Sequence, residues 1–167
     1  MVRIRQILVP TDFSATSDAA LDYAREVASR FGASLHLLHV LQDPFVAGPL
    51  VADAYVADTP GVRTTILDDA RARLAHRVAR RDRETFDVSA EAVFGRGADT
   101  IVEYAADRHI DLIIMGTHGR TGVAHLLLGS VAERVVRTAP CPVLTVRAAA
   151  EREHVHLPLA VPAQVAS

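Results

Sequence analysis

One stretch, residues 111–130, constrains the fold of this 167-residue chain more than any other. It reads DLIIMGTHGRTGVAHLLLGS, in which four apolar residues run into Gly116, and Gly119 and Gly129 follow before an apolar-periodic segment opens at Ser130. The pattern predicts a buried strand, a glycine-punctuated loop and a helix. Such a loop aims backbone N–H groups at one spot, and a helix N-terminus adds about half a positive charge there. The stretch therefore predicts a cradle for phosphate.

The rest of the chain alternates strand and helix signals. Strands are predicted at residues 6–10, 34–40, 86–94, 112–115 and 143–146, and helices at about 14–31, 67–83, 100–108 and 130–138. This alternation requires right-handed crossovers and a parallel sheet that helices cover on both faces. We therefore predict an α/β fold with a doubly wound, five-stranded parallel sheet.

Two segments carry no clear period. Residues 41–61 contain several prolines and glycines, and loops of about twenty residues in a compact domain are usually functional or mobile. From Ala148 the chain again loses its pattern. We therefore expect one folded domain over residues 1–147, followed by a tail over 148–167 that is disordered or docked on the surface.

Composition excludes several classes of protein. The net charge of -2 gives no basic footprint for nucleic acid or anionic lipid, so neither a nucleic-acid nor a membrane partner is expected. No apolar run reaches the ~20 residues of a membrane span, and the N-terminal apolar run is too short for a secretory signal, which predicts a cytoplasmic protein. Cys141 is the one cysteine, so no internal disulfide can form. All 18 basic residues are Arg, which excludes Walker-type phosphate loops and Schiff-base enzymes, because both need Lys.

The glycine spacing carries a family resemblance. Gly116, Gly119, Gly129 and Ser130 fit the pattern G-x-x-G-x9-G-[ST], with ILVPTDFS near the start of the chain and LLLGSVAERVVRTAPCPVLTVR near its end. Over residues 3–147 the chain resembles the universal stress protein family, in particular its ATP-binding subclass. The resemblance implies an adenine-nucleotide α-hydrolase-like fold with strand order 3-2-1-4-5.

That strand order places a candidate site. Ligands of doubly wound sheets bind at the carboxyl ends of strands where the order reverses, here between the first and fourth strands. Asp12, at the end of the first strand, is an acceptor suited to ribose or adenine donors. The resemblance implies adenine contact near Thr11, Asp12 and Val40, ribose contact near Asp12, Met115 and Gly116, and phosphate contact from Gly119, Gly129, Ser130 and Val131. The candidate residues for binding ATP, with or without Mg²⁺, are Pro10, Thr11, Asp12, Val40, Met115, Gly116, His118, Gly119, Arg120, Gly129, Ser130 and Val131.

Five of these positions also have an ordinary structural interpretation. Ser130 with Glu133 fits a capping box, so Ser130 could cap its own helix. Asp12 could cap the first helix, Gly116 could serve only a close contact between strand and helix, and Gly129 could be only a turn residue. His118 and Arg120 could add charge to the site, although His118 could equally be an ordinary surface residue.

The function predicted from these residues is a nucleotide-dependent regulator. Phosphoryl transfer needs a placed base, metal ligands and cations around the γ-phosphate. The sequence offers Asp12, His118 and Arg120 but no compact constellation, which favours a switch over an ATPase and leaves slow hydrolysis open. The resemblance implies a role in stress response through nucleotide-dependent contacts with an unknown protein partner.

Three other classes of protein compete with this interpretation. A nucleotide-free structural or chaperone-like stress module would leave the glycine loop empty. An enzyme of the α-hydrolase type should carry an SGGxDS or HIGH signature, and the sequence contains neither. A dinucleotide enzyme is disfavoured because Gly95-x-Gly97 lacks a third glycine and follows the third predicted strand.

The last predicted strand suggests how copies of the chain assemble. Val143 to Val146 form an edge strand in the implied order, and no charge lies between Pro140 and Arg147. Exposed apolar edges invite pairing, so we expect a homodimer in which two such strands pair antiparallel across a two-fold axis. The resemblance implies the same interface.

Overall fold

The computed structural model describes residues 3–42, 61–117 and 129–147. In this part of the chain the strands are β1 (Gln6–Pro10), β2 (Ser34–Leu41), β3 (Val88–Phe94), β4 (Leu112–Gly116) and β5 (Val143–Val146). The helices are α1 (Ala15–Phe31), α2 (Val62–Arg77), α3 (Arg80–Thr85), α4 (Gly97–Asp107) and α5 (Ser130–Thr138).

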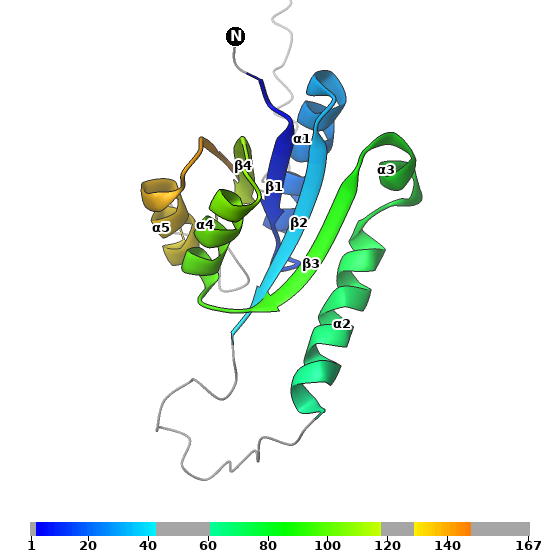
Figure 1. The fold of residues 1–167 in the computed structure, drawn as a ribbon, viewed down its shortest axis with the longest axis vertical. Coiled ribbons are helices and arrows are strands. Elements are labelled where there is room, and N and C mark those ends of the chain that lie inside the picture. Colours follow the sequence, from blue (N-terminus) through cyan, green and yellow to red (C-terminus); the bar gives the residue numbers. More distant parts are fainter. Residues whose placement is uncertain (1–2, 43–60, 118–128, 148–167) are drawn as a thin grey trace, which may run out of the picture.

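The strands form one five-stranded sheet in the order β3-β2-β1-β4-β5. Figure 1 labels the first four of these strands. Every pair of neighbours is parallel, with Leu8 of β1 opposite His36 of β2 on one side and Ile113 of β4 on the other. The predicted doubly wound sheet is confirmed. The strand order reverses between β1 and β4, so the connections leave these two strands in opposite directions and open a crevice at their carboxyl ends.

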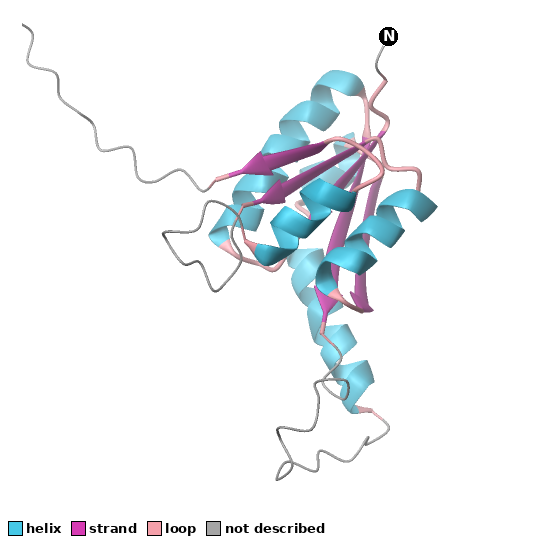
Figure 2. Ribbon diagram, turned by 90° about the vertical axis from the view of Figure 1, so that its left-hand side faces the viewer, coloured by secondary structure: helices cyan, strands magenta, loops and turns pink. Residues whose placement is uncertain are grey.

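Helices cover both faces of the sheet (Figure 2), which explains the unbroken apolar runs in β1 and β4. Successive side chains of β1 point to opposite faces. Ile7 and Val9 enter the core beneath α1 and α2, whereas Leu8 enters the core beneath α4 and α5. All three of these side chains are 0% exposed. Each strand therefore places alternate residues in the two cores, and this alternation decides on which face of the sheet the residues at its carboxyl end lie.

The predicted helix over residues 67–83 is wrong at residues 78 and 79, where the structure divides it into two helices. α2 ends at Arg77, the next two residues have extended ψ angles of 99° and 154°, and α3 begins at Arg80. Asp82 is 2% exposed and its carboxylate accepts the N–H of Ala79 at 2.8 Å and the guanidinium of Arg25 at 2.7 Å. A buried carboxylate needs such donors, so the chain breaks where Asp82 can reach them.

Other element boundaries shift by a few residues. β3 begins at Val88 rather than at residue 86, and α4 begins at Gly97 rather than at residue 100. Most of the predicted long loop, residues 43–60, and the predicted tail lie outside the described residues. None of the helices in the described segments is long and apolar enough to cross a bilayer.

Candidate functional site: a pocket at the carboxyl edge of the sheet

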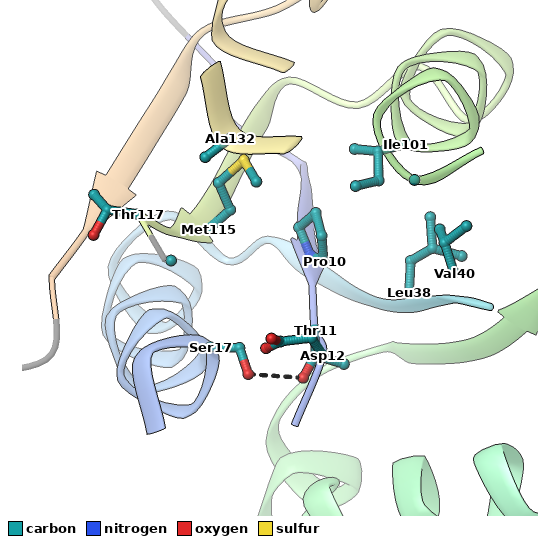
Figure 3. Close-up of a pocket in the computed structure, with 12 residues that line it drawn as sticks. Pro10, Thr11, Asp12, Ser17, Leu38, Val40, Ile101, Met115, Thr117 and Ala132 are labelled. Atoms are coloured by element: carbon teal, nitrogen blue, oxygen red, sulfur yellow. Dashed lines mark hydrogen bonds between the residues drawn. The ribbon is translucent and has the colours of Figure 1, made fainter. Parts of the chain in front are cut away.

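A pocket of about 140 Å³ lies at the carboxyl ends of β1 and β4, where the strand order reverses (Figure 3). Its walls come from the ends of three strands and from the first turns of α1, α4 and α5. The residues that line it are Pro10, Thr11, Asp12, Ser17, Leu38, Val40, Gly97, Ile101, Met115, Gly116, Thr117 and Ala132. The ends of the two motif-bearing strands therefore meet in one cavity.

The pocket has an apolar side and a polar side. Leu38 and Val40 of β2 face Ile101 of α4, and Met115 closes this part, so the surface there is aliphatic. Thr11, Asp12, Ser17 and Thr117 bring hydroxyl and carboxylate oxygens to the opposite part. An apolar cleft with a few placed polar groups is the usual form of a small-molecule site. This division suits a ligand with a flat apolar ring at one end and hydroxyl groups beyond it.

Hydrogen bonds hold the segment after β1 in place. The N–H of Thr11 donates to the carbonyl of Leu38 at 2.9 Å, and its own carbonyl accepts from Nδ1 of His39 at 2.7 Å. Oδ1 of Asp12 accepts the N–H of Ser14 at 3.1 Å, which is an Asx turn leading into the helix. The N-cap of α1 is Ser14, so the interpretation of Asp12 as the cap is wrong.

Gly116 serves a close contact between strand and helix. A Cβ atom at this position would lie 2.9 Å from Cγ2 and 3.1 Å from the backbone carbonyl carbon of Thr16 in α1. Any larger residue would push α1 away from β4, so the structural interpretation of Gly116 holds. Gly116 also lines the pocket. Its contact with a nucleotide stays a prediction.

The start of α5 differs from the predicted capping box. Gly129 is the N-cap and Ser130 is the first helical residue, so Ser130 does not cap its own helix. The N–H of Gly129 donates to the carbonyl of Thr117 at 2.7 Å, and the first intrahelical bond runs from Glu133 to Gly129. The N–H groups of the first helical turn, at residues 130–132, precede that bond and point out of the helix end. They, rather than the N–H of Gly129, are the donors that this end offers to an anion.

The pocket gathers half of the candidate residues predicted from sequence. Pro10, Thr11, Asp12, Val40, Met115 and Gly116 line it. Gly129, Ser130 and Val131 stand at the start of α5, beside lining residue Ala132. His118, Gly119 and Arg120 lie outside the described residues.

Sequence reasoning missed six of the lining residues: Ser17, Leu38, Gly97, Ile101, Thr117 and Ala132. Two of them had a usable signal. Leu38 lies two residues before Val40, and side chains two apart share a face of a strand. Thr117 directly follows Gly116. Nothing in the sequence shows which turn of α4 reaches the carboxyl edge, so Gly97 and Ile101 had no such signal.

Two further observations bear on chemistry. Asp12 is the only ionisable side chain among the described residues that line the pocket. Within the described segments, no group of three His, Cys, Asp or Glu side chains is placed to hold a metal ion. The described walls therefore offer shape and hydrogen bonding more than acid–base chemistry.

Comparison with known proteins identifies the family. Residues 3–147 match the model of the universal stress protein family. The chain belongs to the universal stress protein family. A universal stress protein of Methanocaldococcus jannaschii, MJ0531, is 33% identical over 144 residues, which cover 86% of this chain and 82% of the relative.

Solved structures of the family share the fold of this universal stress protein. The structure of MJ0577, from the same organism, is 29% identical with a TM-score of 0.75, covering 87% of this chain and 97% of its own. A universal stress protein solved in complex with cAMP is 27% identical with a TM-score of 0.57, covering 87% of this chain and 98% of its own. These neighbours have the adenine-nucleotide α-hydrolase-like fold, which confirms the predicted fold class.

Proposed function

We propose that this universal stress protein binds ATP in the carboxyl-edge pocket and acts as a nucleotide-dependent regulator. The observation that carries the proposal is the meeting of Pro10-Thr11-Asp12 with Met115-Gly116 in one pocket, at the reversal of the strand order. The relative solved with cAMP supports it, because cAMP is an adenine nucleotide and that protein shares most of this chain's length.

The walls of the pocket fit the parts of ATP. The aliphatic side, formed by Leu38, Val40 and Ile101, would take the adenine ring. Asp12 would accept a hydrogen bond from the ribose. The phosphates would lie toward the first turn of α5, where N–H groups and the helix dipole attract anions. Gly119, with His118 and Arg120, would continue this cradle, and Mg²⁺ would enter with the phosphates.

We propose binding with little or no turnover. Phosphoryl transfer needs a base or a residue that positions water, together with cations around the γ-phosphate. In the described walls Asp12 is the one ionisable group, and its Oδ1 already accepts the N–H of Ser14. Cys141 does not line the pocket, and burial raises the pKa of its thiol, which disfavours the nucleophilic thiolate.

Calorimetric titration tests the proposed function. ATP, ADP and AMP would be titrated, with and without Mg²⁺, into protein that has been stripped of bound nucleotide. We expect micromolar binding that weakens as phosphates are removed, and a separate assay of inorganic phosphate should find little or no release. Absence of binding by all three nucleotides would overturn the ATP switch and favour a nucleotide-free stress module.

We also propose that two copies pair through β5. This strand ends the sheet, and among the described strands it pairs only with β4. Leu144 is 41% exposed on it. A dimer would give a nucleotide signal two identical sites and one shared surface for a protein partner.

A further inference from the structure

Two hydroxyl groups, those of Thr11 and Ser17, face each other in the polar wall of the pocket. Their oxygen atoms are 3.0 Å apart, the hydrogen bond drawn as a dashed line in Figure 3. Ser17 is 4% exposed and belongs to the first turn of α1. The distance alone does not say which hydroxyl donates, yet the direction decides what this wall offers to a ligand.

The neighbouring carbonyl group settles the direction. Oγ of Ser17 lies 2.8 Å from the carbonyl oxygen of Ser14, and a carbonyl oxygen can only accept. The single hydroxyl proton of Ser17 is therefore used there. The proton between the two hydroxyl groups must come from Thr11, whose Oγ1 also accepts the N–H of Phe13 at 3.0 Å.

Backbone hydrogen bonds fix the direction in which Thr11 donates to Ser17. Both backbone groups of Thr11 are paired, with Leu38 and with His39. Ser17 is fixed by its own N–H, which donates to Oγ of Ser14 at 3.2 Å. Neither hydroxyl group can turn its proton toward the pocket without losing a hydrogen bond, which costs free energy in a buried site.

We propose that Ser17 is a specificity-determining residue: by taking the Thr11 proton, it leaves the part of the wall formed by Thr11, Ser17 and Asp12 able only to accept hydrogen bonds. The carboxylate group of Asp12 beside it brings acceptor oxygens to the same part of the wall. The ligand group against this wall must then be a donor, which in a nucleotide is a ribose hydroxyl or the amino group of the purine. Phosphate oxygens are excluded from this wall, so they must lie toward α5. The inference rests on the proposed nucleotide binding.

Analogues that replace one donor group by a group of similar size that cannot donate test the wall. ITP carries a carbonyl in place of the purine amino group, and 2′-fluoro and 3′-fluoro ATP each carry fluorine in place of a sugar hydroxyl. All three keep the triphosphate, so contacts at α5 are unchanged. We expect at least one analogue to bind about tenfold more weakly than ATP, the size expected for one unsatisfied hydrogen bond. The analogue affected identifies the ligand group.

The variant Ser17→Ala tests the role of Ser17 itself. It frees the Thr11 proton, which can then turn to the new acceptor, so the penalty for that analogue should fall to about threefold or less. Ser14→Ala is the matched control. It removes the cap hydroxyl but keeps the carbonyl that holds the Ser17 proton, so it should lower the free energy of unfolding and leave the tenfold penalty unchanged.

The outcomes separate this inference from the proposed function. If ATP binds but all three analogues match it within about twofold, or if Ser17→Ala keeps the whole penalty, the role of Ser17 is wrong while nucleotide binding stands. If no nucleotide binds, both fail. Neutron diffraction from deuterium-exchanged crystals gives a readout that needs no ligand. A deuteron on Thr11 Oγ1 directed at Ser17 is expected, and a deuteron on Ser17 directed at Thr11 would overturn the inference.

Discussion

Glycine occupies two positions beside the pocket for different physical reasons. At Gly116 a Cβ would collide with Thr16, so the position is fixed by packing before any ligand is considered. At Gly129 the backbone angles, φ −72° and ψ 155°, are ones that any residue adopts. The absence of a side chain at Gly129 is therefore not required by the local backbone, and space for a ligand is the explanation that we propose.

Gly129→Val tests that explanation. Valine readily adopts the extended backbone angles of this position, so the thermal unfolding midpoint should change by no more than a few degrees. Its branched Cβ would stand in front of the first turn of α5, and ATP should bind at least about tenfold more weakly, since overpacking costs about 1–3 kcal/mol. Calorimetric titration measures the affinity, and Gly129→Ala should be intermediate. Unchanged affinity in the valine variant would remove this helix end from the site.

The buried ion pair between Arg25 and Asp82 provides a second test. The side chain of Asp82 is only 3% exposed, so Asp82→Ala leaves the guanidinium of Arg25 without a buried partner. The substitution should lower the free energy of unfolding by about 3 kcal/mol. Asp22→Ala is the matched control, because Asp22 pairs with the same arginine at 2.8 Å but is 73% exposed. It should cost less than about 1 kcal/mol in a denaturant melt. Equal losses would show that burial does not decide the strength of these pairs.

Sequence reasoning succeeds for the residues whose place is set by strand ends. Pro10-Thr11-Asp12 and Met115-Gly116 directly follow buried strands, and the resemblance supplied the strand order that brings them together. The bond between Thr11 and Ser17 could not be predicted. It depends on the angle at which α1 leaves the Asx turn of Asp12, which is set by packing against β4 rather than by local composition.

At the scale of elements, too, the features that local sequence determines were predictable and those that tertiary contacts determine were not. β1 and β4 were predictable because burial on both faces produces short apolar runs, which are typical of a helix-covered parallel sheet, and β3 was predictable from its alternating pattern. The break between α2 and α3 was not, because the arginine-rich stretch continues through it and has good helix propensity. What ends α2 is a partner more than fifty positions away, Arg25, which draws Asp82 inward.

One element-scale network should make stability depend on pH. His36 of β2 lies beneath α4, with Nδ1 3.1 Å from the hydroxyl of Tyr104 and Nε2 2.7 Å from Oε1 of Gln6. Tyr104 donates to Glu91 at 2.9 Å, and burial with this hydrogen bond raises the pKa of Tyr104 to about 12. Burial, aided by the charge of Arg108, lowers the pKa of His36, although Glu91 and Asp87 oppose it.

The sign of the effect follows from that direction. Between its folded pKa and the ordinary value of 6.5, His36 is neutral in the folded protein and protonated in the unfolded chain. Its contribution to stability is therefore complete above pH 6.5 and is lost as the pH falls through the folded pKa. Urea melts from pH 7.5 to 5 should show a decline that His36→Gln makes shallower, by at most about 1.4 kcal/mol per pH unit. His76→Gln, on the exposed side of α2, is the control, and an equal slope in both variants would contradict the assignment to His36.

At the scale of the whole molecule, the sheet has two unequal ends. β3 closes one end and is covered by α2, whereas β5 closes the other with Leu144 41% exposed. A strand edge that presents apolar side chains is a site of pairing. The proposed dimer joins two β5 strands antiparallel and leaves each pocket on its own protomer.

Leu144→Arg tests this assembly. The substitution places two like charges close together across the two-fold axis, so the dimer should dissociate to a monomer at micromolar concentration while the far-UV circular dichroism is unchanged. Sedimentation equilibrium measures the mass. The matched control is Ala90→Arg, which puts the same charge at an exposed position on the opposite edge strand, β3, and should stay dimeric.

Because the pocket lies at the carboxyl edge of a single sheet, the monomeric variant should still bind ATP with unchanged affinity. If wild-type protein is itself a monomer, β5 is available to a different partner and the homodimer is wrong. If Leu144→Arg stays dimeric, the copies meet on another face.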